Sequence, residues 1–311
     1  MADSLTAYRR YLDPRTLAKI SSLEMRARLI VEGVMTGSHR SPYQGISVEF
    51  AQHRPYTPGD DIRHVDWKVL ARADKVYLKQ YQEETNLQLI LVVDASESMG
   101  FGSLKLESDV AGGKWTKYDH AISLAASLAY MAVHQADSVG LAIFDQQLAR
   151  YFKPSSSPTQ WKLITTELQQ MPRWNKTGIG KVLDQIAEKL THRSVIVLLS
   201  DCFDDLESIK KGLRHLRYKK HEVILMQIFD EQEVSFPFQD VTLFKGLEEL
   251  GNLLTEPRAL REGYLEQLTL FTDQLKKLCR GMNIDYQRFV TNEPLDVSLS
   301  QFLANRSASM K

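Results

Sequence analysis

A short run of oxygen-bearing side chains directly follows the apolar segment Gln88 to Val93. Asp94, Ser96 and Ser98 occupy alternating positions in this run. One carboxylate and two hydroxyls within a single turn offer three hard oxygen ligands, which suit Mg²⁺, and also Mn²⁺ or Ca²⁺, better than zinc. Ser and Asp are also common in loops because they cap helices and turns. The run therefore indicates a metal site only if further ligands lie at the same place.

Two further polar residues are candidates for that site. Asp201 follows a second apolar segment, 194–199, and Thr177 comes just before a predicted helix at 180–190. Ligands of open α/β sheets bind outside the carboxyl ends of the strands, near the point where the strand order reverses. The sequence therefore predicts that Asp94, Ser96, Ser98, Thr177 and Asp201 converge at one sheet edge.

The elements needed to position these residues alternate along the chain after residue 86. Continuous apolar segments predict strands at 88–93, 139–144, 194–199, 222–229 and 284–290. Between them, patterns typical of helices cover 118–135, 159–170, 180–190, 206–217 and about 260–279. Residues 148–152 are expected to pair beside the second strand, and 241–245 with 252–255 to form a hairpin. Buried strands between amphipathic helices predict an α/β fold with a doubly wound, mostly parallel, Rossmann-like sheet.

The first 86 residues have a different character. Apolar residues recur at three- and four-residue spacing from Leu17 to Val34, which predicts a helix, whereas residues 38–86 are rich in charges and turn formers. Short alternating segments at 47–50 and 76–81 predict strands. We therefore expect two domains: 1–86, a helix plus a smaller β-rich lobe, and 87–311, the α/β domain with a C-terminal helical and hairpin extension.

Composition narrows the class of protein. Basic and acidic residues both number 39, so the net charge is zero and gives no general attraction to nucleic acid. The N-terminal residues lack the apolar core of a signal peptide, and the apolar stretches are shorter than the roughly 20 residues that cross a bilayer. Two cysteines do not form a disulfide framework. We expect a cytoplasmic protein with no direct membrane insertion, in which Cys202 is a packed thiol.

Taken together, the five candidate ligands resemble the metal-ion-dependent adhesion site of von Willebrand factor A domains. The resemblance implies that Ser96, Ser98 and Thr177 coordinate the ion directly or through water, and that Asp94 and Asp201 often act through water. It also implies that an acidic residue of a protein partner completes the coordination. The chain departs from the pattern at Lys176, where a glycine is often found.

A dense block between Gly45 and Arg72 closely resembles the signature of the bacterial "domain of unknown function 58" family. Members of that family carry this block before a von Willebrand factor A-like domain. The resemblance implies a cytosolic adaptor that works with a MoxR-type AAA+ ATPase, or with its client, in the maturation or assembly of other proteins.

The residues of this block allow two interpretations. Asp60, Asp61 and Asp66 with His64 could form a second metal or acid/base site. Alternatively, acidic and arginine side chains form structural ion pairs that hold the lobe in place. The second set comprises Glu49, Asp60, Asp66, Arg54, Arg63 and Arg72.

Other signals bear on function. No histidine is near Asp94 or Asp201 in sequence, and His120 and His134 are expected on a helix face. Because hydrolytic metal sites need a base and an activated water, the sequence favours a non-enzymatic, metal-dependent binding module. A metal-dependent hydrolase of phosphoesters or peptides, using Asp94 and Asp201 or the 60–66 block, and a scaffold with an empty loop are the alternatives. The basic residues at 210–220 form either an acidic-partner patch or a solvated face, and the 101–117 loop could form a mobile rim over the metal.

Overall fold

The computed structural model describes residues 17, 22–37, 53–55, 77–79, 87–105, 114–170, 172, 175–247 and 251–309. The chain divides into two compact units, residues 43–86 and the remainder. Of the smaller unit, the structure describes β1 (His53–Pro55) and β2 (Tyr77–Lys79), which pair antiparallel. β2 lies within the strand predicted at 76–81. The strand predicted at 47–50 and most of the Gly45–Arg72 block, including all its acidic residues and His64, lie outside the described residues.

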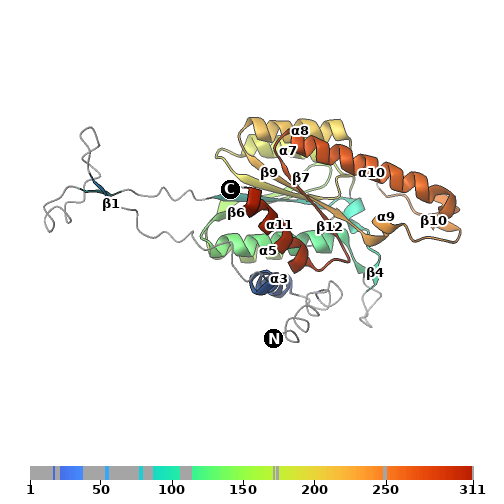
Figure 1. Cartoon of the computed structure of the whole chain (residues 1–311), viewed down its shortest axis with the longest axis horizontal. Coiled ribbons are helices and arrows are strands. Elements are labelled where there is room, and N and C mark those ends of the chain that lie inside the picture. Colours follow the sequence, from blue (N-terminus) through green and yellow to red (C-terminus); the bar gives the residue numbers. More distant parts are fainter. Residues whose placement is uncertain are drawn as a thin grey trace. The chain divides into compact units, whose positions relative to one another are not determined.

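A six-stranded sheet forms the centre of the larger unit, in the order β12-β9-β8-β3-β6-β7 (Figure 1). All neighbouring pairs are parallel except β6 and β7. The strands are β3 (Gln88–Asp94), β6 (Ser138–Phe144), β7 (Leu148–Ser155), β8 (Val195–Ser200), β9 (Glu222–Phe229) and β12 (Asp285–Val290). Successive strands build outward from β3, first through β6 and β7 and then, on its other side, through β8, β9 and β12. This arrangement confirms the predicted α/β fold with a doubly wound, mostly parallel sheet.

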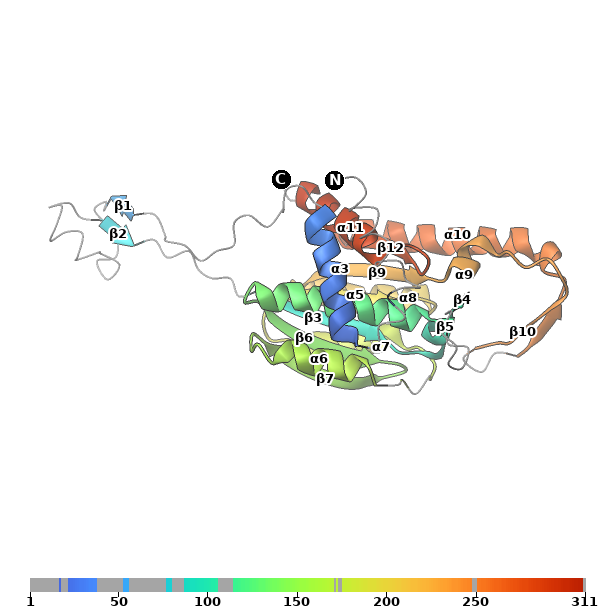
Figure 2. The ribbon, with the colours of Figure 1, turned by 90° about the horizontal axis from the view of Figure 1, so that it is seen from below.

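Helices cover both faces of the sheet (Figures 1 and 2). One face carries α3 (Leu23–Gly37), α5 (Lys117–His134), α6 (Gln160–Leu168) and α11 (Leu295–Ser309), and the other carries α7 (Ile179–Lys189), α8 (Leu206–Tyr218) and α10 (Pro257–Gly281). Alternate residues of β3 feed the two cores: Leu91 packs on the α5 side and Val92 on the α7 side. A strand buried on both faces has no polar alternation, which explains its continuous apolar sequence.

The division into units differs from the predicted domains in where residues 1–42 belong, whereas the boundary after residue 86 is the same. Residues 1–42 belong to the same unit as 87–311, because α3 packs its apolar side, including Ala27 and Ile30, against α5 and α11. Residues 43–86 form the separate unit. α11 itself was not predicted from sequence.

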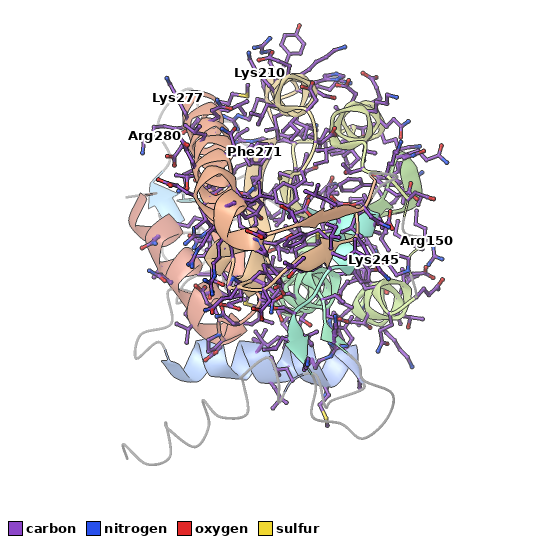
Figure 3. All side chains as sticks on the ribbon, turned by 90° about the vertical axis from the view of Figure 1, so that its right-hand side faces the viewer. Arg150, Lys210, Lys245, Phe271, Lys277 and Arg280 are labelled. Carbon is purple, nitrogen blue, oxygen red and sulfur yellow. The ribbon has the colours of Figure 1, made fainter. Side chains whose placement is uncertain are left out.

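A hairpin, predicted at 241–255, extends from the carboxyl edge of the sheet. It consists of β10 (Thr242–Phe244) and β11 (Leu253–Thr255), and follows the short helix α9 (Glu231–Ser235). Phe244 stacks on Phe236, whereas Leu243 and Leu254, paired across the strands, are 52% and 67% exposed. Figure 3 views the molecule from the end where the hairpin lies, with Lys245 labelled. Among the described helices, none combines the length and apolar character that a bilayer crossing requires.

Candidate metal site

The candidate site lies where the strand order reverses, between β3 and β8. These strands are parallel neighbours, with Val93 opposite Leu199. Asp94 ends β3 and Asp201 follows β8, so the register brings the two carboxylates to the same edge. Both residues are fully buried. The predicted convergence of these two strand ends is therefore present in the structure.

Asp94 is held by hydrogen bonds from both sides. Its Oδ1 accepts from the backbone N–H of Ser96 at 2.9 Å, and its Oδ2 accepts from the Ser200 hydroxyl at 2.5 Å. Burial, and then repulsion from Asp201, raise the pKa of Asp94 to about 7, although these hydrogen bonds oppose the shift. A nearby cation would stabilise the ionised form of Asp94, which burial and Asp201 disfavour.

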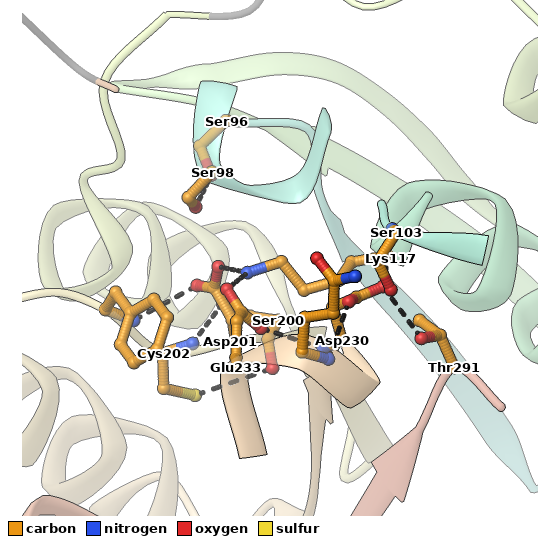
Figure 4. Close-up of polar contacts among 12 residues, drawn as sticks. Ser96, Ser98, Ser103, Lys117, Ser200, Asp201, Cys202, Asp230, Glu233 and Thr291 are labelled. Carbon is orange, nitrogen blue, oxygen red and sulfur yellow. Dashed lines mark hydrogen bonds and ion pairs between the residues drawn. The ribbon is translucent and has the colours of Figure 1, made fainter. Parts of the chain in front are cut away.

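The two serines of the run lie together above the strand ends. Ser96 precedes the short 3₁₀ helix η2 (Glu97–Gly100), which carries Ser98. Their hydroxyl oxygens are 3.1 Å apart, and both residues are buried (Figure 4). A 3₁₀ turn directly after the strand therefore directs two neutral oxygen ligands to one point.

Local backbone geometry fixes Asp201. Cys202 has φ 63°, a left-handed conformation that is unusual for a side chain larger than glycine. This turn lets the Phe203 N–H donate to Asp201 Oδ1 at 3.1 Å and the Cys202 N–H donate to the Ser200 hydroxyl at 2.9 Å. Burial raises the pKa of the Cys202 thiol well above its usual value, which supports a packed thiol and not a nucleophile.

The segment carrying Thr177 lies beside the serine loop. The N–H of Glu97 donates to the backbone oxygen of Asn175 at 2.8 Å, which ties the two loops together. At Gly178, a Cβ atom would stand 2.6 Å from the backbone oxygen of Gln146, so this close approach requires glycine. Thr177 is partly buried and lies between Asn175, which contacts the serine loop, and Gly178.

The structure adds a cation that the sequence did not reveal. Lys117, the first residue of α5, is 1% exposed, and its Nζ donates to Asp201 Oδ2 at 2.8 Å and to Glu233 Oε1 at 2.6 Å (Figure 4). Burial alone would lower the pKa of Lys117, but the two carboxylates outweigh it and raise the pKa, so the ammonium is charged.

Two sequence signals could have located the starts of the helices around this cluster, although not the burial of the lysine itself. Thr116 and Asp119 form a capping box, which begins α5 one residue earlier than predicted and directs Lys117 inward. Asp230 directly follows β9, the same strand-end position that identified Asp94 and Asp201. It caps α9, the helix that carries Glu233. Asp230 itself is fully buried and accepts hydrogen bonds from Ser103, Gln232 and Thr291.

The donor set fits a hard divalent cation. Two buried carboxylates lie at neighbouring strand ends, and burial and then Asp201 raise the pKa of Asp94; Ser96 donates its N–H to Asp94, and its hydroxyl lies 3.1 Å from that of Ser98. Within the part of the chain that the structure describes, no three or more His, Cys, Asp or Glu side chains gather as a metal-binding group. The five candidate ligands are two carboxylates and three hydroxyls, the kinds of oxygen donor that hard divalent cations accept.

The two histidines of α5, the basic stretch and the 101–117 loop were the other functional candidates of the sequence. His134 is exposed, whereas His120 is fully buried and its Nδ1 accepts from the indole N–H of Trp115 at 3.4 Å. Burial lowers the pKa of His120 to about 3, so it is neutral. In the basic stretch at 210–220, Lys210 pairs with Glu207 and Lys219 pairs with Glu188, which favours a solvated face. Of the 101–117 loop, residues 106–113 lie outside the described part.

Curated relatives resemble the chain over nearly its whole length. "Uncharacterized protein Rv1480" of Mycobacterium tuberculosis and "Uncharacterized protein Mb1516" of Mycobacterium bovis are each 24% identical to it over 298 residues, which cover 94% of this chain and 90% of the relative.

Solved structures also align with the chain. BatB of Bacteroides thetaiotaomicron, a conserved hypothetical protein, is 15% identical with a TM-score of 0.45, covering 72% of this chain and 99% of BatB. The SpRpn10 VWA domain is 11% identical with a TM-score of 0.38, covering 70% and 95%.

The family model described as "Protein of unknown function DUF58" matches residues 52–270, which include β1, β2, every candidate ligand and the hairpin. The chain belongs to this family.

Proposed function

We propose that this protein is a metal-dependent protein-binding module in which a Mg²⁺ ion at Asp94, Ser96, Ser98, Thr177 and Asp201 takes up an acidic side chain of a partner. The observation that carries this proposal is the pair of buried carboxylates at neighbouring strand ends, with Asp94 hydrogen-bonded to Ser96 and its pKa raised to about 7. A bound divalent ion would relieve the repulsion between Asp94 and Asp201. Because its other protein ligands are neutral, the ion would still attract a carboxylate from outside.

The surface around the site supports a protein partner. A cavity of about 250 Å³ opens beside the serine loop, lined among others by Ala95, Asn175 and Arg150. The exposed leucines of the β10–β11 hairpin, Leu243 and Leu254, lie at the same end of the sheet. Exposed apolar side chains clustered on one element mark protein contacts more often than chance positions do.

The resemblance to the "domain of unknown function 58" family, which implies an adaptor of a MoxR-type AAA+ ATPase, supports a partner of this class. We propose an adaptor in the cytoplasm that binds a MoxR-type AAA+ ATPase or its client during protein maturation or complex assembly.

A metal-dependent hydrolase is the second candidate, and it receives less support. Such a site needs a general base near the ion. The nearest histidine by sequence to the Lys117 cluster, His120, is neutral with its Nδ1 occupied by Trp115. Turnover of a generic phosphoester with Mn²⁺, lost in Asp201→Asn, would favour this candidate over the binding module.

The proposal is tested by capture of a MoxR-type ATPase from the same genome on the immobilised protein, in Mg²⁺ and in chelator. We expect capture in Mg²⁺ only, and its loss in Asp94→Asn. Asp184→Asn, on a partly exposed carboxylate that pairs with His215 on another part of the chain, is the matched control and should capture normally. Capture that survives both the chelator and Asp94→Asn would exclude a metal-dependent interaction.

A further inference from the structure

The ammonium group of Lys117 contacts one of the candidate metal ligands, Asp201. Its ammonium is 2.8 Å from Asp201 Oδ2, so it already neutralises one of the two candidate carboxylate ligands. Asp201 Oδ1 accepts the N–H of Phe203. Both oxygens of Asp201 therefore already have partners, and Lys117 neutralises part of the charge that a metal ion would bind.

Glu233 offers the ammonium a second anchor. Its Oε1 is 2.6 Å from Lys117 Nζ, and its Oε2 accepts the N–H of Asp230 in the capping box of α9. Glu233 is thus held by its own helix and does not depend on Asp201. Lys117 can keep a carboxylate partner even if its contact with Asp201 weakens.

The surroundings of Lys117 keep the ammonium in place. Its Nζ lies 5.0 Å from the centre of the Phe203 ring, and the residue is 1% exposed. Water cannot replace a lost carboxylate at such a position. The ammonium therefore depends on its ion pairs with Asp201 and Glu233 for stabilisation.

Building on the proposed metal site, we infer that Lys117 is a tethered competitor of the metal ion for Asp201, and that Glu233 tunes this competition by drawing the ammonium away. Lys117 is a positioning and affinity-setting residue, not a ligand. Its positive charge weakens the ion's hold on the site, whereas Glu233 partly restores it.

The test is calorimetric titration of the whole chain with Mg²⁺ alone. Lys117→Met removes the competitor at similar length, and we expect it to bind Mg²⁺ at least tenfold more tightly, which corresponds to about 1.4 kcal/mol. Glu233→Gln leaves Lys117 with Asp201 alone, so it should bind Mg²⁺ more weakly than the natural protein. In the Lys117→Met background the Glu233→Gln change should have a smaller effect, because no ammonium remains to be redirected.

A matched control exists at the opposite end of the sheet. Arg306 bridges Glu222 and Asp285 as Lys117 bridges Glu233 and Asp201. Glu222→Gln should leave Mg²⁺ affinity unchanged. Circular dichroism checks the fold of each variant, and Glu233→Gln tests the inference if Lys117→Met does not fold.

The outcomes separate the two proposals. If the natural protein binds Mg²⁺ but Lys117→Met binds it equally or more weakly, or Glu233→Gln binds it more tightly, the competitor role is wrong and the metal site stands. If only Lys117→Met binds Mg²⁺, the competitor role stands and the natural site is closed to the ion. If none of the folded proteins binds Mg²⁺, both proposals are overturned.

Discussion

Asp94→Asn should stabilise the metal-free protein while abolishing its response to Mg²⁺. The amide has nearly the shape of the carboxyl group, can still accept the Ser96 N–H, and presents an NH₂ to the Ser200 oxygen. It removes the negative charge that burial and Asp201 penalise. The predicted gain in stability and loss of binding come from the same charge.

The magnitude follows from the pKa of Asp94, about 7 in the folded protein against a usual value of 3.8. A raised folded-state pKa favours folding at low pH, and this contribution is lost as the pH rises from below 4 through 7. With 1.36 kcal/mol for each pH unit, Asp94 costs the folded protein roughly 4 kcal/mol at pH 8, where it is mostly ionised, and roughly 2 kcal/mol at pH 5, where folding requires it to take up a proton. The advantage of Asp94→Asn should therefore increase from pH 5 to pH 8.

Urea unfolding in chelator, at both pH values, measures this advantage. Asp201→Asn is the matched variant: it also removes one carboxylate, but leaves Lys117 with Glu233 alone, so it should destabilise the protein. Added Mg²⁺ at about 100 times its dissociation constant should stabilise the natural protein by roughly 2.7 kcal/mol and Asp94→Asn not at all. A destabilised Asp94→Asn at pH 8, or one that keeps the Mg²⁺ response, would refute the electrostatic account of the site.

Three further predictions concern other parts of the larger unit. Burial lowers the folded-state pKa of His120 from 6.5 to about 3, so the natural protein loses stability as the pH falls below 6.5. In urea unfolding, the free energy of unfolding of His120→Asn should fall by about 2 kcal/mol less between pH 8 and pH 5 than that of the natural protein. Gly180→Ala places a Cβ 2.5 Å from a backbone oxygen of α8 and should lower the free energy of unfolding by about 1–3 kcal/mol, whereas Gly263→Ala, with open space around it in α10, should be neutral or stabilising. Replacing Leu243 and Leu254 with serine should change the unfolding free energy by less than about 0.5 kcal/mol and reduce capture of the ATPase; unchanged capture would remove the hairpin from the interface.

The sheet was predictable because buried parallel strands carry a strong and simple signal. The run from Gln88 to Val93 is apolar at every position after the first, and both of its faces are indeed covered. The acidic residue after such a strand is equally visible, which is how Asp94 and Asp201 were placed together. Because Asp230 also follows a buried strand, the same reasoning would have predicted that α9 lies at this edge.

The sequence could not predict the Lys117 cluster or α11, for two different reasons. Lys117 and Asp201 are 84 positions apart, and nothing local distinguishes a lysine whose ammonium is buried from one that is exposed at a helix start. The pattern of α11 is weak because its first residues, including Leu295, are covered by α3 and β12, so no single polar face repeats. Tertiary contacts, and not local periodicity, decide both.

The composition of the candidate site has a consequence for how ion and partner would depend on each other. With two candidate carboxylates, one of them shared with Lys117, an ion bound as proposed would be held by less charge than a site with three or more acidic ligands would supply. A partner carboxylate would then contribute a large part of the charge that holds the ion. Linkage requires that the ion raise partner affinity by the same factor by which the partner raises ion affinity. A site that binds its ion weakly alone is therefore suited to sense the partner, because neither ligand saturates it without the other.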